Sequence, residues 1–201
     1  IRSLSALATG EALTLAYYHR PSLAAWVQGV AAQHDLRASV VFSSAMAPYA
    51  QALAPDVPML VDFVDVDSAK WSQYADTHRW PMSWLDRREG RTRLGYERAG
   101  AAQARQSFFV TSNEMDLFLR LAPECTATVQ AMSNGVDADF FAPDAARPNP
   151  YSADELPVVF TGAMDYWPNI DGVSWFTADV LPRLMAHWPR VHFYIVGRNP
   201  P

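Results

Sequence analysis

The chain has 201 residues, of which 50% are apolar and 12% aromatic, so it has enough hydrophobic material for a substantial core. Its formal net charge of −5 argues against nucleic acid as the main partner, and its single cysteine, Cys125, excludes an internal disulfide bond and a cysteine-based zinc cluster. No apolar run approaches the roughly 18 residues of a spanning helix, and the first residues lack the apolar core of a secretory signal, which favours a cytoplasmic location.

Short apolar runs alternate with segments of helical periodicity in the first two thirds of the chain. The predicted strands are residues 39–42, 59–66, 107–110 and 129–132. The predicted helices are residues 4–8, 13–18, 21–32, 45–53, 69–76 and 81–104, and a further helix begins after Ser112. Asp67-Ser68 and Ser112 are the predicted N-caps of the helices that follow them. Ser133, Asn134 and Gly135 are predicted to form a turn.

The long predicted helix over residues 81–104 is locally basic. It carries Arg87, Arg88, Arg91, Arg93 and Arg98 against Glu89 and Glu97. This pattern favours a solvent-exposed helix with ion pairs at i,i+4 spacing. The alternative hypothesis is that the helix docks on an anionic inner-membrane leaflet, which suits an enzyme with a lipid-linked acceptor.

The last third of the chain predicts a β-α-β unit. Residues 142–155 are rich in Pro, Asp and Ala without periodicity, which is typical of a linker between two domains, 1–145 and 146–201. Strands over residues 157–161 and 191–196 flank a helix over residues 170–188, so the strands should be parallel and the fold class α/β. Gly162 and Gly197 follow the strands at their carboxyl ends, where ligands bind in such sheets.

The segment FTGAMDYWPNIDGVSWFTADVLPRL, followed by FYIVGRNP, resembles the opening of the second Rossmann-like domain of a GT-B glycosyltransferase of the family 4 type. The segments SLSALATGEALTLAYY, VVFSSAMAPY, DFVDVDSAKWSQYA, YERAGA and MSNGVDADFFAP are also similar, with the PEP-CTERM/exosortase sugar transferases closest. The resemblance implies a partial N-terminal acceptor-side domain (1–145) and a truncated C-terminal donor-binding domain (146–201). The chain is then expected to be a fragment that is inactive alone and lacks the family's acidic catalytic pair.

The same resemblance implies retaining transfer of a hexose from a nucleotide sugar to a lipid-linked or saccharide acceptor, in exopolysaccharide or glycolipid synthesis, with no metal or other cofactor. It assigns donor binding to Gly162, Asp165, Asn169, Gly197, Arg198, Asn134, Gly135 and Asp137. Unlike many family members, this chain has no Arg or Lys directly after the strand at 157–161, so the phosphate charge would have to be met by backbone N–H groups, by Arg198 or by residues beyond Pro201. The plainer interpretation makes these loops ordinary turns, with Asn169 and Asp137 as helix N-caps.

Asp65 lies at the end of the predicted strand 59–66, and Asp67 and Lys70 follow it. All three are assigned to the acceptor side, with Asp65 as the catalytic candidate. Asp65-Val66-Asp67 also matches the metal-binding DxD of GT-A enzymes and the nucleophile motif of haloacid-dehalogenase-like (HAD-like) phosphatases. The alternatives to a glycosyltransferase are therefore a HAD-like phosphatase that uses Asp65 and Asp67, or a non-catalytic module that binds sugar nucleotides.

Overall fold

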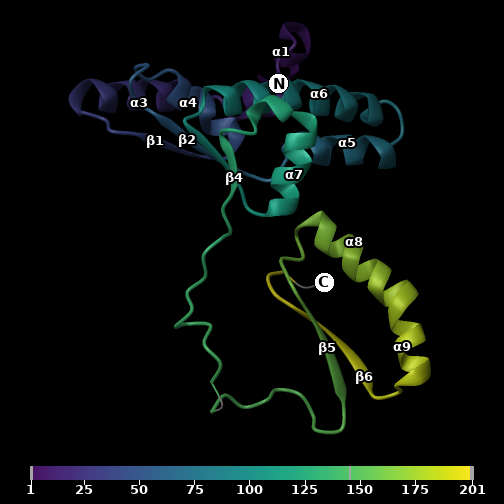
Figure 1. The fold of residues 1–201 in the computed structure, drawn as a ribbon. Helices are drawn as coiled ribbons and strands as arrows, with labels where there is room; N and C mark the ends of the chain where they lie inside the picture. Colours follow the sequence, from purple (N-terminus) through teal and green to yellow (C-terminus); the bar gives the residue numbers. More distant parts are fainter. Residues whose placement is uncertain (1, 145, 200–201) are drawn as a thin grey trace. The chain divides into compact units, whose positions relative to one another are not determined.

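The computed structural model describes residues 2–144 and 146–199 (Figure 1). The chain divides into two compact units, Ile1–Val136 and Asp137–Pro201. The boundary predicted from the sequence, after residue 145, lies farther along the irregular segment that connects the last strand of the first unit to the first strand of the second.

The first unit contains a parallel four-stranded sheet in the order β1-β2-β3-β4. The strands are β1 (Ser39–Phe42), β2 (Met59–Val64), β3 (Gln106–Phe109) and β4 (Val129–Ala131). Each lies within two residues of its predicted position, because short apolar runs bounded by turn residues are the local signal of buried parallel strands. The α/β class is confirmed for this unit.

Seven α-helices of the first unit are described. They are α1 (Arg2–Thr9), α2 (Leu13–Tyr18), α3 (Pro21–Gln33), α4 (Ala47–Gln51), α5 (Asp67–Thr77), α6 (Met82–Gln103) and α7 (Ser112–Leu121). The predicted helix over residues 45–53 is divided into a 3₁₀ turn, Ser44–Met46, and α4. None of the described helices is both long and apolar enough to cross a bilayer.

One face of the sheet carries the core. Val61 and Phe63 of β2 pack with Phe109 of β3, Ala101 of α6 and Phe118 of α7. The Phe63 and Phe109 rings stack 5.3 Å apart, and the Phe109 and Phe118 centroids are 4.9 Å apart. α6 and α7 therefore cover this face. The residues of α6 that extend toward the loops after β1 and β2 lie at the carboxyl edge of the sheet.

Close contact between α5 and α6 depends on Gly90. The two helices lie side by side (Figure 1), and a Cβ atom at Gly90 would come within 2.9 Å of Ser72 Oγ and 3.1 Å of the Ser68 carbonyl oxygen. The sequence suggests only that this glycine weakens the helix. In the structure it lets the helix backbones approach closely enough for side chains of α6 to reach Ser68.

The second unit is the predicted β-α-β unit. β5 (Leu156–Thr161) pairs in parallel with β6 (Val191–Val196). The predicted single helix is α8 (Trp167–Trp175), a π-helical segment Phe176–Val180, and α9 (Leu181–His187). Pro182 is the second residue of α9 and has no N–H to donate to the preceding turn, which explains why the regular hydrogen-bond ladder is interrupted here.

Two of the predicted N-caps are wrong. The N-cap of α5 is Val66, and Asp67 lies in the first turn, where its carboxylate bonds to an arginine of α6. The N-cap of α7 is Thr111, whose side chain accepts a hydrogen bond from the Glu114 N–H at 3.1 Å, so Ser112 is the first helical residue. Thr111 and Ser112 are both good capping residues by type, so the sequence could not distinguish them, whereas Val66 is a poor capping residue and its side chain makes no cap hydrogen bond.

Candidate functional site

Polar residues follow β1 and β2 at the same edge of the parallel sheet. Ser44 lies just beyond β1, and Asp65 and Asp67 lie just beyond β2. Ser44 Oγ lies 3.4 Å from Asp67 Oδ2 and donates to it. This edge is where ligands bind in open α/β sheets, so the side chains here form the first candidate site.

The backbone at the end of β2 is strained. Val64 has a φ of 69°, and the Asp65 N–H donates to the Phe63 carbonyl at 2.9 Å, which together form the rare classic γ-turn. A second tight turn follows, in which the Asp67 N–H donates to the Asp65 carbonyl at 3.1 Å. A left-handed β-branched residue costs on the order of 1–3 kcal/mol and occurs most often at functional sites. These turns present both aspartates beyond the strand end.

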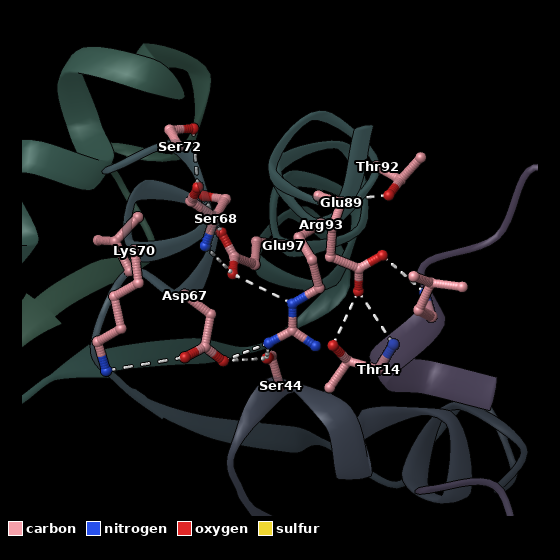
Figure 2. A network of polar contacts seen from close by, with 12 residues as sticks. Thr14, Ser44, Asp67, Ser68, Lys70, Ser72, Glu89, Thr92, Arg93 and Glu97 are labelled. Atoms are coloured by element: carbon pink, nitrogen blue, oxygen red, sulfur yellow. Dashed lines mark hydrogen bonds and ion pairs between the residues drawn. The ribbon is translucent and has the colours of Figure 1, made fainter. Parts of the chain in front are cut away.

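Arg93 of α6 is the centre of a buried polar group that we call the Arg93 cluster. The cluster consists of Ser44, Asp67, Ser68, Arg93 and Glu97 (Figure 2). Arg93 Nη2 donates to Ser44 Oγ at 2.8 Å and to Asp67 Oδ2, and Arg93 Nε lies 3.8 Å from Glu97 Oε1. The Arg93 side chain is 1% exposed, so its charge is balanced by these carboxylates rather than by water.

Glu97 holds the start of α5. Its carboxylate accepts hydrogen bonds from the Ser68 N–H at 3.1 Å and from Ser68 Oγ at 2.6 Å. Burial raises the pKa of Glu97 to about 7, although the hydrogen bonds from Ser68 and the charge of Arg93 lower it. Glu97 therefore titrates near neutral pH while fixing the helix that carries Asp67.

Glu89 has a different task on the same helix. Its carboxylate accepts from the Leu13 N–H at 2.7 Å, the Thr14 N–H at 3.0 Å and Thr14 Oγ1 at 2.8 Å (Figure 2). It thus caps α2 from a distant part of the chain. The interpretation of residues 81–104 as a solvent-exposed charged helix is wrong for Glu89, Arg93 and Glu97, all of which are buried.

The three residues predicted on the acceptor side lie together. Lys70 Nζ is 2.6 Å from Asp65 Oδ2 and 3.9 Å from Asp67 Oδ1. Asp65 is 33% exposed, so it is accessible to a ligand. The described residues contain no group of three or more His, Cys, Asp or Glu side chains arranged to hold a metal, and the aspartates pair with cationic side chains instead.

The glycine turns of the second unit form the other candidate site, which we call the glycine loops (Gly162–Asn169 and Gly197–Asn199). The Gly162 N–H donates to the Val196 carbonyl at 3.0 Å, and the Met164 N–H donates to the Arg198 carbonyl at 2.8 Å. Gly197 has a φ of 146°, and a Cβ atom there would lie 2.0 Å from the Gly162 carbonyl oxygen. Only glycine fits, so both loops have a close-packed, specific geometry.

Side chains hold the glycine loops together. Asp165 accepts from Arg198 Nη2 at 3.2 Å and from Asn199 Nδ2 at 3.1 Å. Partial desolvation raises the pKa of Asp165, but the hydrogen bond and charge of Arg198, together with hydrogen bonds from the backbone and Asn199, lower the pKa overall. Asn169 Nδ2 donates to the Ala163 carbonyl at 2.9 Å, so Asn169 fastens the loop and is not the N-cap of α8, which is Tyr166.

The predicted donor residues are thus only partly brought together. Gly162, Asp165, Asn169, Gly197 and Arg198 share the glycine loops, whereas Asn134 and Gly135 belong to the first unit. The predicted turn at residues 133–135 is absent, and the turn after β4 involves Asp137, whose Oδ1 accepts from the Phe140 N–H at 2.9 Å. Asp137 therefore stabilises a turn, and no helix begins after it in the described segment between β4 and β5, so its interpretation as a helix N-cap is wrong.

Sequence reasoning missed Arg93 and Glu97, together with their partners Ser44 and Ser68. A signal for them does exist. Ser83, Asp86, Gly90, Arg93, Glu97 and Ala101 recur at intervals of three and four residues, which places these charges on the same helix face as small residues.

No protein-family model and no curated protein matches this chain.

Proposed function

We propose that this chain acts in a retaining glycosyltransferase of the GT-B, family 4 type, which moves a hexose from a nucleotide sugar to an acceptor hydroxyl in exopolysaccharide or glycolipid synthesis. The observation that carries the proposal is the pair of glycine loops. They place Gly162, Gly197, Asp165 and Arg198 together at the carboxyl ends of two parallel strands, with a helix beginning directly behind them. This is the location at which such folds bind nucleotides.

The chemistry requires charge to be neutralised on a departing nucleoside diphosphate. Arg198 is 72% exposed and its guanidinium is held toward Asp165, so it is positioned over the glycine loops yet accessible to an anion. A guanidinium can bind two phosphate oxygens at once, and this charge-assisted pairing strengthens as the leaving group gains charge. The close-packed loop backbone adds fixed dipoles that need not reorganise during the reaction.

On the acceptor side, Asp65 and Lys70 would orient the attacking hydroxyl. Asp65 is the partly exposed carboxylate, and Lys70 fixes its direction through the 2.6 Å ion pair. Arg93 acts indirectly, as a positioning residue. It holds Asp67 and, through Glu97 and Ser68, the start of α5. Such alignment lowers the entropic part of the barrier to transfer.

Calorimetric titration of the chain with UDP- and GDP-sugars tests donor binding. Loss of the phosphate contact in Arg198→Ala should raise the Kd of the preferred donor at least about tenfold. Arg190→Ala is the matched control, because Arg190 is also exposed but precedes β6 at the opposite end of the strand, and it should leave the Kd unchanged. If no nucleotide sugar binds, or both variants bind equally, the donor assignment fails.

The phosphatase hypothesis remains the second candidate, because the two tight turns after β2 present Asp65 and Asp67 beyond a parallel strand end. Magnesium-dependent hydrolysis of p-nitrophenyl phosphate that disappears in Asp65→Asn would favour it. Donor binding without sugar transfer or donor hydrolysis would instead favour the non-catalytic module.

A further inference from the structure

Folding buries the acids of α6, and Arg93 with them, but leaves other arginines of the helix exposed. Its acids Asp86, Glu89 and Glu97 are at most 1% exposed, and each has a partner within the first unit. Arg87 and Arg91, by contrast, point outward. The sequence around these residues is nearly balanced in charge, yet the exposed charge in the first turns of the helix is basic.

Exposed aromatic side chains adjoin these arginines. Trp80, directly before α6, is 81% exposed, and Trp84 is 53% exposed. Trp84, Arg87 and Arg91 have the i, i+3, i+7 spacing of one helix face. With Trp80 they line a hollow of about 500 Å³, which Ser72 and Asp76 of α5 complete on the other side. We call Trp80, Trp84, Arg87 and Arg91 the tryptophan–arginine surface.

The physical chemistry of this surface matches a lipid headgroup region. Tryptophan concentrates at membrane–water interfaces, where its ring is buried among headgroups and its N–H remains hydrated. Exposed arginines are attracted to anionic lipids by about 1 kcal/mol each. Arg79 and Met82, which lie next to Trp80 and Trp84 in the sequence, are also exposed. The acid that faces this surface, Asp76, is 80% exposed and lies 3.8 Å from Arg87, a separation at which pairing is weak.

From these exposed arginines and aromatic side chains, we infer that the tryptophan–arginine surface binds an anionic phospholipid bilayer, with Arg87 and Arg91 on lipid phosphates and Trp80 and Trp84 among the headgroups. The binding is peripheral and reversible, because two cations and two rings supply far less free energy than a spanning helix. The inference does not depend on the proposed transferase activity.

Vesicle flotation tests it with the whole chain. Binding to equimolar phosphatidylglycerol–phosphatidylcholine vesicles is expected at about 0.1 M salt, with little binding to phosphatidylcholine alone and a loss at about 0.5 M salt. Arg87→Ser with Arg91→Ser should lower the partition coefficient about thirtyfold. Trp80→Ala with Trp84→Ala should lower it about tenfold or more.

Matched controls distinguish binding by this surface from nonspecific adsorption to vesicles. Trp26 on α3 is 64% exposed and Arg105 is exposed, and neither lies in the hollow. Trp26→Ala and Arg105→Ser should bind vesicles like the parent, and circular dichroism should show every variant folded. Absence of binding to anionic vesicles, equal binding to both vesicle types, or equal losses in the controls would overturn the inference.

Discussion

Replacing Arg93 by Met tests the energetic role of the Arg93 cluster. Met fills similar space with an unbranched, uncharged side chain, so the change chiefly removes the cation. It leaves Glu97, which is 1% exposed, and Asp67, which is 30% exposed, without their buried countercharge. Breaking a buried ion pair in this way costs about 3–5 kcal/mol.

The expected loss lies near the lower end of that range. Water can reach Asp67 in part, and Glu97 can take up a proton because its pKa is already about 7. We therefore expect a loss of about 3 kcal/mol at pH 8. Without Arg93 the pKa of Glu97 rises further, so the loss should be smaller by about 1 kcal/mol at pH 6, where Glu97 is protonated with or without the arginine.

The measurement must report on the first unit alone. Hydrogen exchange followed by mass spectrometry in rising urea gives the free energy of opening for peptides of α5 and α6. Arg105→Met, at an exposed position, is the control and should change stability by less than about 0.5 kcal/mol. Adding Glu97→Gln to Arg93→Met should recover part of the loss, because one unpaired charge is removed. A change below about 1 kcal/mol at both pH values would refute the reasoning.

Three further substitutions test individual contacts. The folded-state pKa of Glu97 (about 7) exceeds its ordinary value of 4.5, so its contribution to stability is complete below pH 4.5 and is lost as the pH rises to 7. Glu97→Gln should therefore remove about 3 kcal/mol of the pH dependence of the unfolding free energy. Urea unfolding from pH 4.5 to 8 measures this change. Gly197→Ala should destabilise β5 and β6 by more than about 2 kcal/mol, measured by hydrogen exchange. Gly172→Ala in α8 is the control and should be neutral or stabilising, because a Cβ there meets nothing within 4 Å. Equal effects of the two substitutions would contradict the close approach of Gly197 to Gly162. Thr111→Ala should cost about 1 kcal/mol in thermal unfolding and Ser112→Ala less than half of that; the reverse order would restore Ser112 as the cap.

The strands and most helices could be predicted because their signals are local. The apolar run at residues 191–196 and the proline at position 21 each specify backbone conformation through nearest neighbours, and both elements lie where the sequence places them. The cluster of Gly162, Asp165 and Arg198 also follows from the sequence, since parallel strands joined by a helix must have their carboxyl ends at one edge.

The environment of each charge was decided by tertiary structure alone. Arg87 and Arg93 are the same residue type on the same helix, yet one is 60% exposed and the other 1%. The difference arises because Ser44 and Asp67, which lie 49 and 26 positions away in the chain, meet Arg93 only when α6 packs across the sheet. Local periodicity carries no information about such distant partners, whereas desolvation and pairing of a charge depend on them entirely.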